Sequence, residues 1–243
     1  MDNYYTNEWE GRFNSCTKVY PLGYEKHTVF NKPVFNPNKL DTEVKVRTDY
    51  EKTDFITRND SLKRGKDKIF DIAILNDFDY FVTFTLDRAK ISRYDYKVIS
   101  SKLKQWLNNA TKRNECKYLI VPELHKDGAV HFHGLIKGKF NLIDSGEKDN
   151  EGRTVYNLQN WKYGFTTCVE LDENKLAVAR YICKYITKDT KMILGNLYYA
   201  GGGVIREPKK EYSNIPYNLA EGKEYEIGTT PLKVKYRDLY KGE

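Results

Sequence analysis

The chain has 243 residues, with 41 lysines and arginines against 34 aspartates and glutamates, which gives a formal net charge of +7. This length accommodates one domain of ordinary size with extensions and a buried hydrophobic core. The positive charge favours a polyanionic partner such as nucleic acid, although basic proteins without such a partner are common. The four scattered cysteines contain no C-x-x-C pair, which argues against a zinc ribbon and against a disulfide framework.

The sequence also argues against a membrane protein and an ATP-driven motor. No apolar run approaches the roughly 20 residues of a membrane-spanning helix, and the first residues lack the basic start and apolar stretch of a secretion signal. We therefore expect a cytoplasmic protein with no membrane partner. No G-x-x-x-x-G-K-[ST] phosphate loop occurs in the chain.

Three segments are expected along the chain. Residues 1–57 are polar and aromatic and are interrupted by prolines, so we expect a loosely structured N-terminal extension. Residues 58–208 carry the periodic patterns of a folded domain. Residues 209–243 are charged and are expected to form a C-terminal extension, with a candidate strand pair at residues 225–227 and 232–236.

The folded domain begins with a predicted helix, a strand and a second helix. Apolar spacing predicts the first helix from Asp60, a candidate N-cap, to Asn76. Residues 80–86 are rich in β-branched and aromatic side chains and are predicted to form a central strand. The apolar residues between Tyr94 and about Thr111 predict the second helix.

A β-hairpin is predicted next. Residues 117–124 and 130–136 are its expected strands, and residues 126–128 suit a three-residue loop in which Gly128 takes the left-handed conformation. Pro122 argues mildly against a regular ladder here, because proline cannot donate a backbone hydrogen bond.

The register of this hairpin decides whether a metal-binding face is formed. A three-residue loop places Glu123 opposite His131, whereas a two-residue turn would place it opposite Phe132. Because side chains alternate along a strand, His131 and His133 point the same way, about 7 Å apart. Two imidazoles and a carboxylate suit Mn²⁺ or Mg²⁺, and would also suit iron or zinc. The alternative is an exposed histidine pair without a ligand. His125 shares their parity and is either an alternate ligand or a solvent-exposed residue.

The remaining elements complete the expected fold. Residues from about 144 to 160 are polar and are expected to lack regular structure, and residues 165–171 are predicted to form another strand. A helix capped by Asp172 is predicted to extend to Lys188. The order of elements indicates an α+β fold, in which a ferredoxin-like antiparallel sheet of about five strands carries helices on one face.

Four residues of this last helix, Tyr181, Lys184, Tyr185 and Lys188, are spaced i, i+3, i+4 and i+7 and so lie along one stripe. Burying two ammonium groups without partners is costly, so a stripe that faces a phosphate accounts for all four residues. The alternative is a helix that packs its tyrosines against the sheet. Cys183 points away from the stripe and is expected to be a packing residue.

Together these patterns suggest a nuclease with a tyrosine nucleophile. A tyrosine with a pKa near 10 is only about one part in a thousand ionised at neutral pH, so it needs activation. A divalent metal ion on a phosphate oxygen makes the phosphorus more electrophilic, and a nearby lysine favours the phenolate. We expect Tyr181, Tyr185, Lys184 and Lys188 to be catalytic, and His131, His133 and Glu123 to bind the metal.

Three motifs, at residues 81–85, 131–133 and 181–188, follow the order found in the His-hydrophobic-His (HUH) endonucleases. The chain resembles in particular the rolling-circle replication initiators of bacteriophages and small plasmids, in their two-tyrosine form. The resemblance covers roughly residues 58–208. It extends to the gene II-like replication group through residues 61–66, Trp161, Gly164 and residues 199–208.

This resemblance implies the HUH fold and a site-specific single-strand DNA endonuclease and ligase. Such an enzyme starts rolling-circle replication by nicking the origin through a 5′-phosphotyrosine. The implied partners are single-stranded or hairpin origin DNA and, since no helicase domain is recognised, a host polymerase and helicase in the bacterial cytoplasm. The alternatives are a related relaxase or single-strand transposase and, from another class, a non-catalytic nucleic-acid-binding module.

Overall fold

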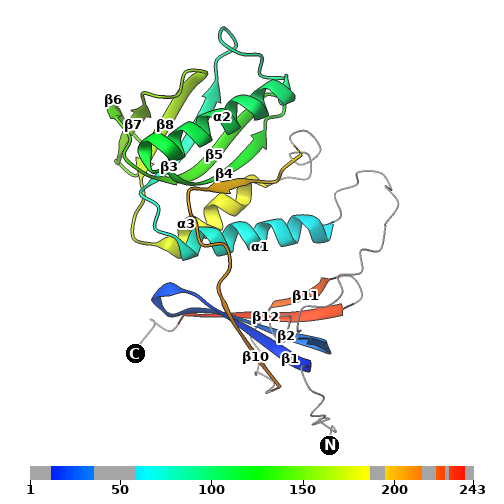
Figure 1. Cartoon of the computed structure of the whole chain (residues 1–243). Helices are drawn as coiled ribbons and strands as arrows, with labels where there is room; N and C mark the ends of the chain where they lie inside the picture. Colours follow the sequence, from blue (N-terminus) through cyan, green and yellow to red (C-terminus); the bar gives the residue numbers. More distant parts are fainter. Residues whose placement is uncertain (1–11, 36–58, 187–194, 215–222, 228–229, 239–243) are drawn as a thin grey trace, which may run out of the picture. The chain divides into compact units, whose positions relative to one another are not determined.

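The computed structural model describes residues 12–35, 59–186, 195–214, 223–227 and 230–238 (Figure 1). The chain divides into two compact units, each with its own antiparallel sheet. One unit is Phe55–Glu207, and the other combines Met1–Asp54 with Pro208–Glu243.

The unit formed by the two terminal segments contains a five-stranded sheet with the strand order β10-β1-β2-β12-β11. Residues 12–35 therefore form two strands and not the loose extension expected from the sequence. Pro21 does not interrupt them, because it lies in the turn η1 (Pro21–Gly23) that joins them. The predicted C-terminal strand pair is confirmed. The strands are β1 (Arg12–Val19), β2 (Tyr24–Phe35), β10 (Lys209–Ser213), β11 (Lys223–Ile227) and β12 (Thr230–Asp238).

The other unit is α+β, as predicted, and its sheet has the strand order β6-β7-β8-β3-β5-β4-β9, with antiparallel neighbours. The expected number of about five strands was therefore too low, since this sheet has seven. The strands predicted at residues 80–86 and 117–124 are confirmed with the same bounds. The strands are β3 (Tyr80–Leu86), β4 (Lys117–Leu124), β5 (Val130–Lys137), β6 (Leu142–Lys148), β7 (Thr154–Leu158), β8 (Gly164–Glu170) and β9 (Tyr199–Gly201).

Strands β6 and β7 form a hairpin in the polar segment that was expected to be irregular. Its turn is built on Asp149, whose carboxylate accepts hydrogen bonds from the backbone N–H groups of Glu151 and Arg153. The Arg153 guanidinium also binds this carboxylate, and Gly152 has a φ of 80°. Turn chemistry therefore supports the hairpin where apolar alternation is weak.

Helices lie on both faces of this sheet, which corrects the prediction of helices on one face. Helix α2 (Tyr96–Asn114) packs on even-numbered residues of the central strands, such as Phe84 and Phe132. Helix α3 (Lys175–Ile182) adjoins β5 from the side of odd-numbered Phe81, and α1 (Asn59–Leu75) packs against α3 and β4. The central strands are buried on both sides because both faces carry apolar residues, a pattern that does not reveal one covered face.

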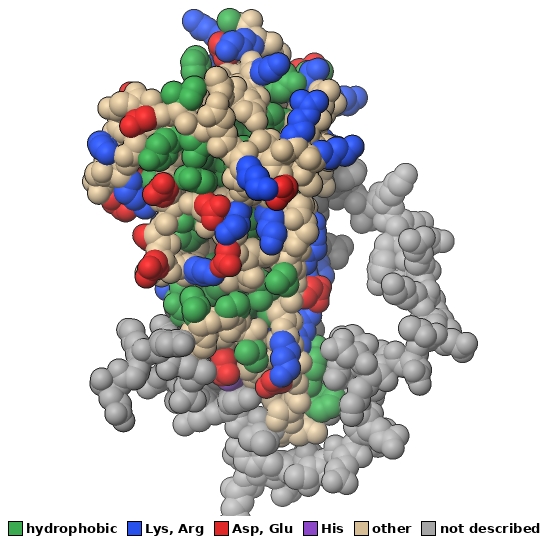
Figure 2. Space-filling model, turned by 60° about the vertical axis from the view of Figure 1, so that its left-hand side comes forward, with side chains coloured by type: hydrophobic (Ala, Val, Ile, Leu, Met, Phe, Trp, Pro, Cys, Tyr) green, Lys and Arg blue, Asp and Glu red, His purple; other side chains and the backbone are tan. Residues whose placement is uncertain are grey.

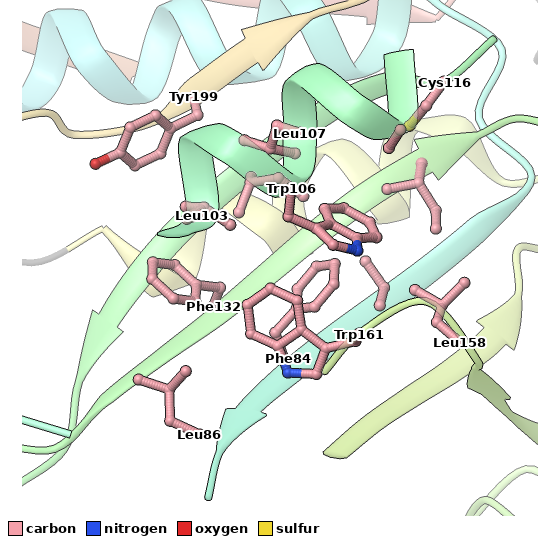
Figure 3. Packing of buried hydrophobic residues seen from close by; sticks show 14 of the residues in the cluster. Phe84, Leu86, Leu103, Trp106, Leu107, Cys116, Phe132, Leu158, Trp161 and Tyr199 are labelled. Atoms are coloured by element: carbon pink, nitrogen blue, oxygen red, sulfur yellow. The ribbon is translucent and has the colours of Figure 1, made fainter. Parts of the chain in front are cut away.

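The core between α2 and the sheet is aromatic (Figure 3). The ring of Phe84 has no exposed surface and lies 4.8 Å from the ring of Trp161 and 5.0 Å from that of Trp106, between centroids. This packing fixes β3, the strand that lies between β5 and β8. No helix within the described residues is long and apolar enough to cross a membrane.

Two helix starts differ from the sequence predictions. Helix α2 begins at Tyr96, after Asp95, whose carboxylate accepts a hydrogen bond from the N–H of Val98. Helix α3 is capped by Asn174 and not by Asp172. Asp172 instead accepts a hydrogen bond from the N–H of Asn174, in the turn that precedes the helix. Several residues of these types lie close together, so local chemistry alone does not select the cap.

Candidate active site

A cross-strand row of side chains defines the candidate site. Glu123 on β4 lies opposite His131 on β5, which confirms the register predicted from the sequence. His131 in turn lies opposite Thr85 on β3, and Thr85 lies opposite Phe165 on β8. These four residues therefore share one face of the sheet, the face that α3 adjoins.

The hairpin that sets this register has the predicted three-residue loop. The N–H of His125 donates to the carbonyl of Ala129, and the N–H of Gly128 donates to the carbonyl of His125. Gly128 has a φ of 82°, as expected. Pro122 fits in β4 because the neighbouring strand β9 pairs only with residues 118–120. Beyond this segment β4 is an edge that needs no donor from proline.

His133 is held at both ring nitrogens. Its Nε2 lies 2.7 Å from Oε2 of Glu123, and its Nδ1 lies 3.2 Å from Oγ1 of Thr83. The sequence analysis missed Thr83, because its role depends on the pairing of β3 with β5, in which Thr83 lies opposite His133. A partner on the second ring nitrogen orients the imidazole and fixes which nitrogen is available to a ligand.

His131 stacks on His125, with ring centroids 3.9 Å apart. Nε2 of His125 lies 3.7 Å from Oε2 of Glu123, so His125 belongs to this cluster although its side chain is 46% exposed. Burial lowers the pKa of His131 and of His133, and the carboxylate of Glu123 opposes this shift without reversing it. Both imidazoles are therefore neutral at neutral pH, the form that can bind a metal ion.

The predicted meeting of the tyrosines with the histidine strand is confirmed. The rings of Tyr185 and His133 are stacked, with centroids 3.7 Å apart. The hydroxyl of Tyr185 donates a hydrogen bond of 2.6 Å to the hydroxyl of Tyr181. Phe81 lies against both tyrosines, with centroid distances of 5.3 Å to Tyr181 and 6.1 Å to Tyr185. Phe81 was not predicted as a site residue, and the contact follows from its place on the same face of β3 as Thr83.

The helix that carries the tyrosines is shorter than predicted. Helix α3 ends at Ile182, a 3-10 turn η2 (Cys183–Tyr185) follows, and the next residue, Ile186, is extended. A tightened last turn is common at a helix end and keeps Tyr181 and Tyr185 close together. Cys183 points away from them, as predicted, since its Sγ lies 3.4 Å from the carbonyl oxygen of Lys66 on α1. Lys188 lies outside the described residues.

The two tyrosines have different surroundings. Tyr181 is 45% exposed, and Nζ of Lys184 lies 5.2 Å from the centroid of its ring. Tyr185 is half-buried, and burial raises its pKa. The hydrogen bond that Tyr185 donates to Tyr181 and the charge of Glu123 act in the same direction. Tyr185 is therefore a neutral phenol at neutral pH.

The donor set for a metal ion is chemically suitable. Two neutral imidazoles and a carboxylate suit a divalent cation. Among the residues that the structure describes, however, no three histidine, cysteine, aspartate or glutamate side chains are grouped so as to hold an ion. The Glu123 carboxylate is hydrogen-bonded to His133, and His131 is stacked on His125.

A cavity of about 560 Å³ opens beside Tyr181. Phe81 and Thr83 of β3 line it from the sheet, and Tyr181 and Lys184 line it from α3 and η2. The turn between β6 and β7, residues 149–153, lines the other side. The cavity therefore gives a ligand access to the exposed tyrosine.

The surface charge is dispersed on the face shown in Figure 2. Lysine and arginine side chains are interspersed there with acidic and hydrophobic ones and form no single continuous patch. Any contact with a polyanion on this face therefore depends on individual cations.

One comparison with known proteins identifies a family resemblance on the same segment. Residues 79–190 match the family model of the replication-associated proteins ORF2 and gene 2 protein. The match supports a Rep-like replication initiator, and the matched segment contains all seven predicted site residues, from Glu123 to Lys188. No curated protein and no solved structure matches the chain in the corresponding comparisons.

Proposed function

We propose that this protein is a site-specific single-strand DNA endonuclease and ligase with the HUH fold, which initiates rolling-circle replication. The observation that carries the proposal is the stacking of Tyr185 on His133, because it unites the tyrosine and histidine motifs in one site. The family match supports the role in replication. Helix α2 links the parallel strands β3 and β4 around β5, a split β-α-β arrangement that supports a ferredoxin-like sheet.

In the proposed reaction, the phenolic oxygen of Tyr181 or Tyr185 attacks the phosphorus of the scissile phosphodiester. A bond forms between this oxygen and phosphorus, the bond from phosphorus to the 3′ oxygen breaks, and the phenolic proton ends on the 3′ oxygen. The products are a 5′-phosphotyrosine and a free 3′-hydroxyl. Because the new ester conserves the energy of the broken bond, attack by a 3′-hydroxyl rejoins the strand without ATP.

The paired tyrosines support repeated rounds of this reaction. Their hydroxyls are 2.6 Å apart, so both lie within reach of the same phosphate. One tyrosine can cleave a second time while the other remains covalently occupied. The ammonium of Lys184 lies beside Tyr181 and would favour its phenolate over the neutral phenol.

His131, His133 and Glu123 would hold a divalent metal ion, Mn²⁺ or Mg²⁺. When bound, such an ion neutralises charge on a phosphate oxygen. In this assignment Glu123 exchanges its hydrogen bond with His133 for the ion, and Thr83 keeps the His133 ring oriented through Nδ1.

The proposed substrate is single-stranded DNA, or DNA extruded as a hairpin, because the scissile phosphate must reach side chains on the face of a sheet. The 3′-hydroxyl would prime a host polymerase, and a host or partner helicase would separate the strands. These steps would take place in the cytoplasm of a bacterial host.

Covalent capture tests the proposal. The protein is incubated with Mn²⁺ and a library of single-stranded oligonucleotides, and adducts that survive denaturation are sequenced and mapped by mass spectrometry. We expect one dominant cleavage sequence and a phosphate on Tyr181 or Tyr185. The double change Tyr181→Phe with Tyr185→Phe should abolish the adduct. Tyr94→Phe, at a tyrosine that is 51% exposed, is the matched control and should leave it intact. An adduct that survives the double change, or DNA binding that never gives an adduct, would reject the nuclease.

A further inference from the structure

Phe165 is exposed on the same face of the sheet as the candidate site. Its side chain is 64% exposed, the largest fraction among the large hydrophobic residues of the described part of the chain. It lies opposite Thr85, which lies opposite His131 on the other side. A large aromatic ring in open solvent on a functional face is the kind of surface on which an unpaired base stacks.

A lysine accompanies this ring. Nζ of Lys90 lies 5.8 Å from the centroid of Phe165, and the side chain of Lys90 is 49% exposed. Its contact with Asp87 is long, at 3.9 Å. The ammonium is therefore placed to meet a phosphate of a strand whose base covers the ring.

Strand β8 leads from Phe165 towards the nucleophiles. Thr167 and Val169 follow on the same face, and both line the cavity beside Tyr181. Consecutive residues on one face are about 7 Å apart, so the path from Phe165 to Val169 is about 13 Å long. This length suits a short run of unpaired nucleotides.

The charges around the cavity suit a polyanion in spite of nearby carboxylates. Arg180 and Lys184 line its helical side. On the opposite side Asp149 and Glu151 are both ion-paired with Arg153, so their charge is largely compensated. The uncompensated cations therefore lie on the side of the nucleophilic tyrosine.

We propose that β8 is the track for the DNA strand, with an unpaired base stacked on Phe165 and the strand continuing past Thr167 into the cavity beside Tyr181. This inference rests on the proposed function and names the residues that hold its substrate. A protein partner would find only one large apolar side chain here, next to the two threonines Thr85 and Thr167. A base needs one ring and one cation, and both are present.

Binding without cleavage tests the track. Fluorescence anisotropy measures the affinity for a labelled single-stranded oligonucleotide, in EDTA and with both Tyr181 and Tyr185 changed to Phe. Phe165→Ala should weaken binding by about 5-fold to 150-fold, the range found when one stacked base loses its aromatic platform. Phe165→Trp should retain the affinity. Ile143→Ala, at another exposed apolar residue on β6, is the matched control and should change nothing.

Photocrosslinking locates the base. An oligonucleotide carries 5-iodouracil at one position at a time, and irradiated complexes are analysed by mass spectrometry. We expect a crosslink to Phe165 from one position near the cleavage site. Unchanged affinity in folded Phe165→Ala, or crosslinks confined to other elements, would overturn the track. So would a change from dimer to monomer in Phe165→Ala with unaltered affinity, because the ring would then serve a protein interface.

The two proposals can fail separately. If Phe165 binds DNA and the wild-type chain forms no covalent adduct, the nuclease is rejected and the track stands. If the adduct forms and Phe165→Ala leaves both DNA affinity and the KM for nicking unchanged, the track alone is rejected. With the track in place, Phe165→Ala should raise KM and leave the rate at saturating DNA unaltered.

Discussion

The ring of Tyr185 lies nearly parallel to that of His133, with an interplanar angle of 18° and the centroids 3.7 Å apart. The two residues come from the last turn after α3 and from the central strand β5. Their contact places a phenol beside an imidazole whose other neighbours are Glu123 and Thr83. A change at any of these neighbours should therefore be felt at the proposed nucleophile.

Thr83→Val tests the positioning of His133. The variant loses the hydroxyl that lies 3.2 Å from Nδ1 of His133. Loss of such a partner lowers metal affinity or activity by roughly 10-fold to 100-fold. We expect adduct formation to slow by this factor and the Mn²⁺ concentration for half-maximal rate to rise. Thr83→Ser retains the hydroxyl and should restore both values, and a valine variant with unchanged Mn²⁺ dependence would contradict the role.

Changes at the two stacked histidines distinguish ligand from neighbour. His131→Ala should remove metal-dependent nicking, because it deletes one of the proposed ligands. His125→Ala should retain it at a reduced rate, since His125 contacts His131 and Glu123 but is not in the proposed ligand set. Nicking rates over a Mn²⁺ titration, with EDTA as the blank, measure both effects. If His125→Ala abolishes the activity and His131→Ala does not, the ligand assignment is wrong.

Gly164 should be intolerant of a side chain. A Cβ at this position would overlap the carbonyl oxygen of Thr85, which is backbone and cannot rotate away. Overpacking of this kind costs about 1–3 kcal/mol, so Gly164→Ala should lower the free energy of unfolding by that amount in a urea titration. Gly65→Ala is the matched control. There the added Cβ would lie 2.6 Å from the end of the flexible Leu197 side chain, and alanine favours the helix. Equal stability losses at both sites would speak against the close approach of β8 to β3.

Two cysteines should resist alkylation in the native protein. Cys116 and Cys168 have no exposed surface, and burial raises the pKa of each thiol to about 12. Only the thiolate reacts readily, so iodoacetamide at pH 8 should label neither residue in the folded chain and both in guanidinium chloride. Mass spectrometry of the peptides gives the extent of labelling. Rapid native labelling of either cysteine would show that its thiol is not held in the core.

The sequence was most informative where the chain interacts with its near neighbours. Alternation and β-branched content gave the bounds of β3 and β4, and the loop around Gly128 gave the register that sets Glu123 opposite His131. Local patterns failed at the β6–β7 hairpin, where a turn built on Asp149 outweighs weak alternation. They also failed at the end of α3, where the stripe drawn to Lys188 exceeds the helix that forms.

Taken alone, the amino-acid sequence determined the histidine strand and its hairpin partner, because those contacts lie within a few residues of one turn. Only the tertiary structure decided that Tyr185 stacks on His133, that Thr83 holds the same ring and that Phe165 shares a row with His131. These contacts depend on which strands pair and on which face a helix packs. Pairing and packing are set by the burial of side chains from the whole unit, so no local pattern encodes them.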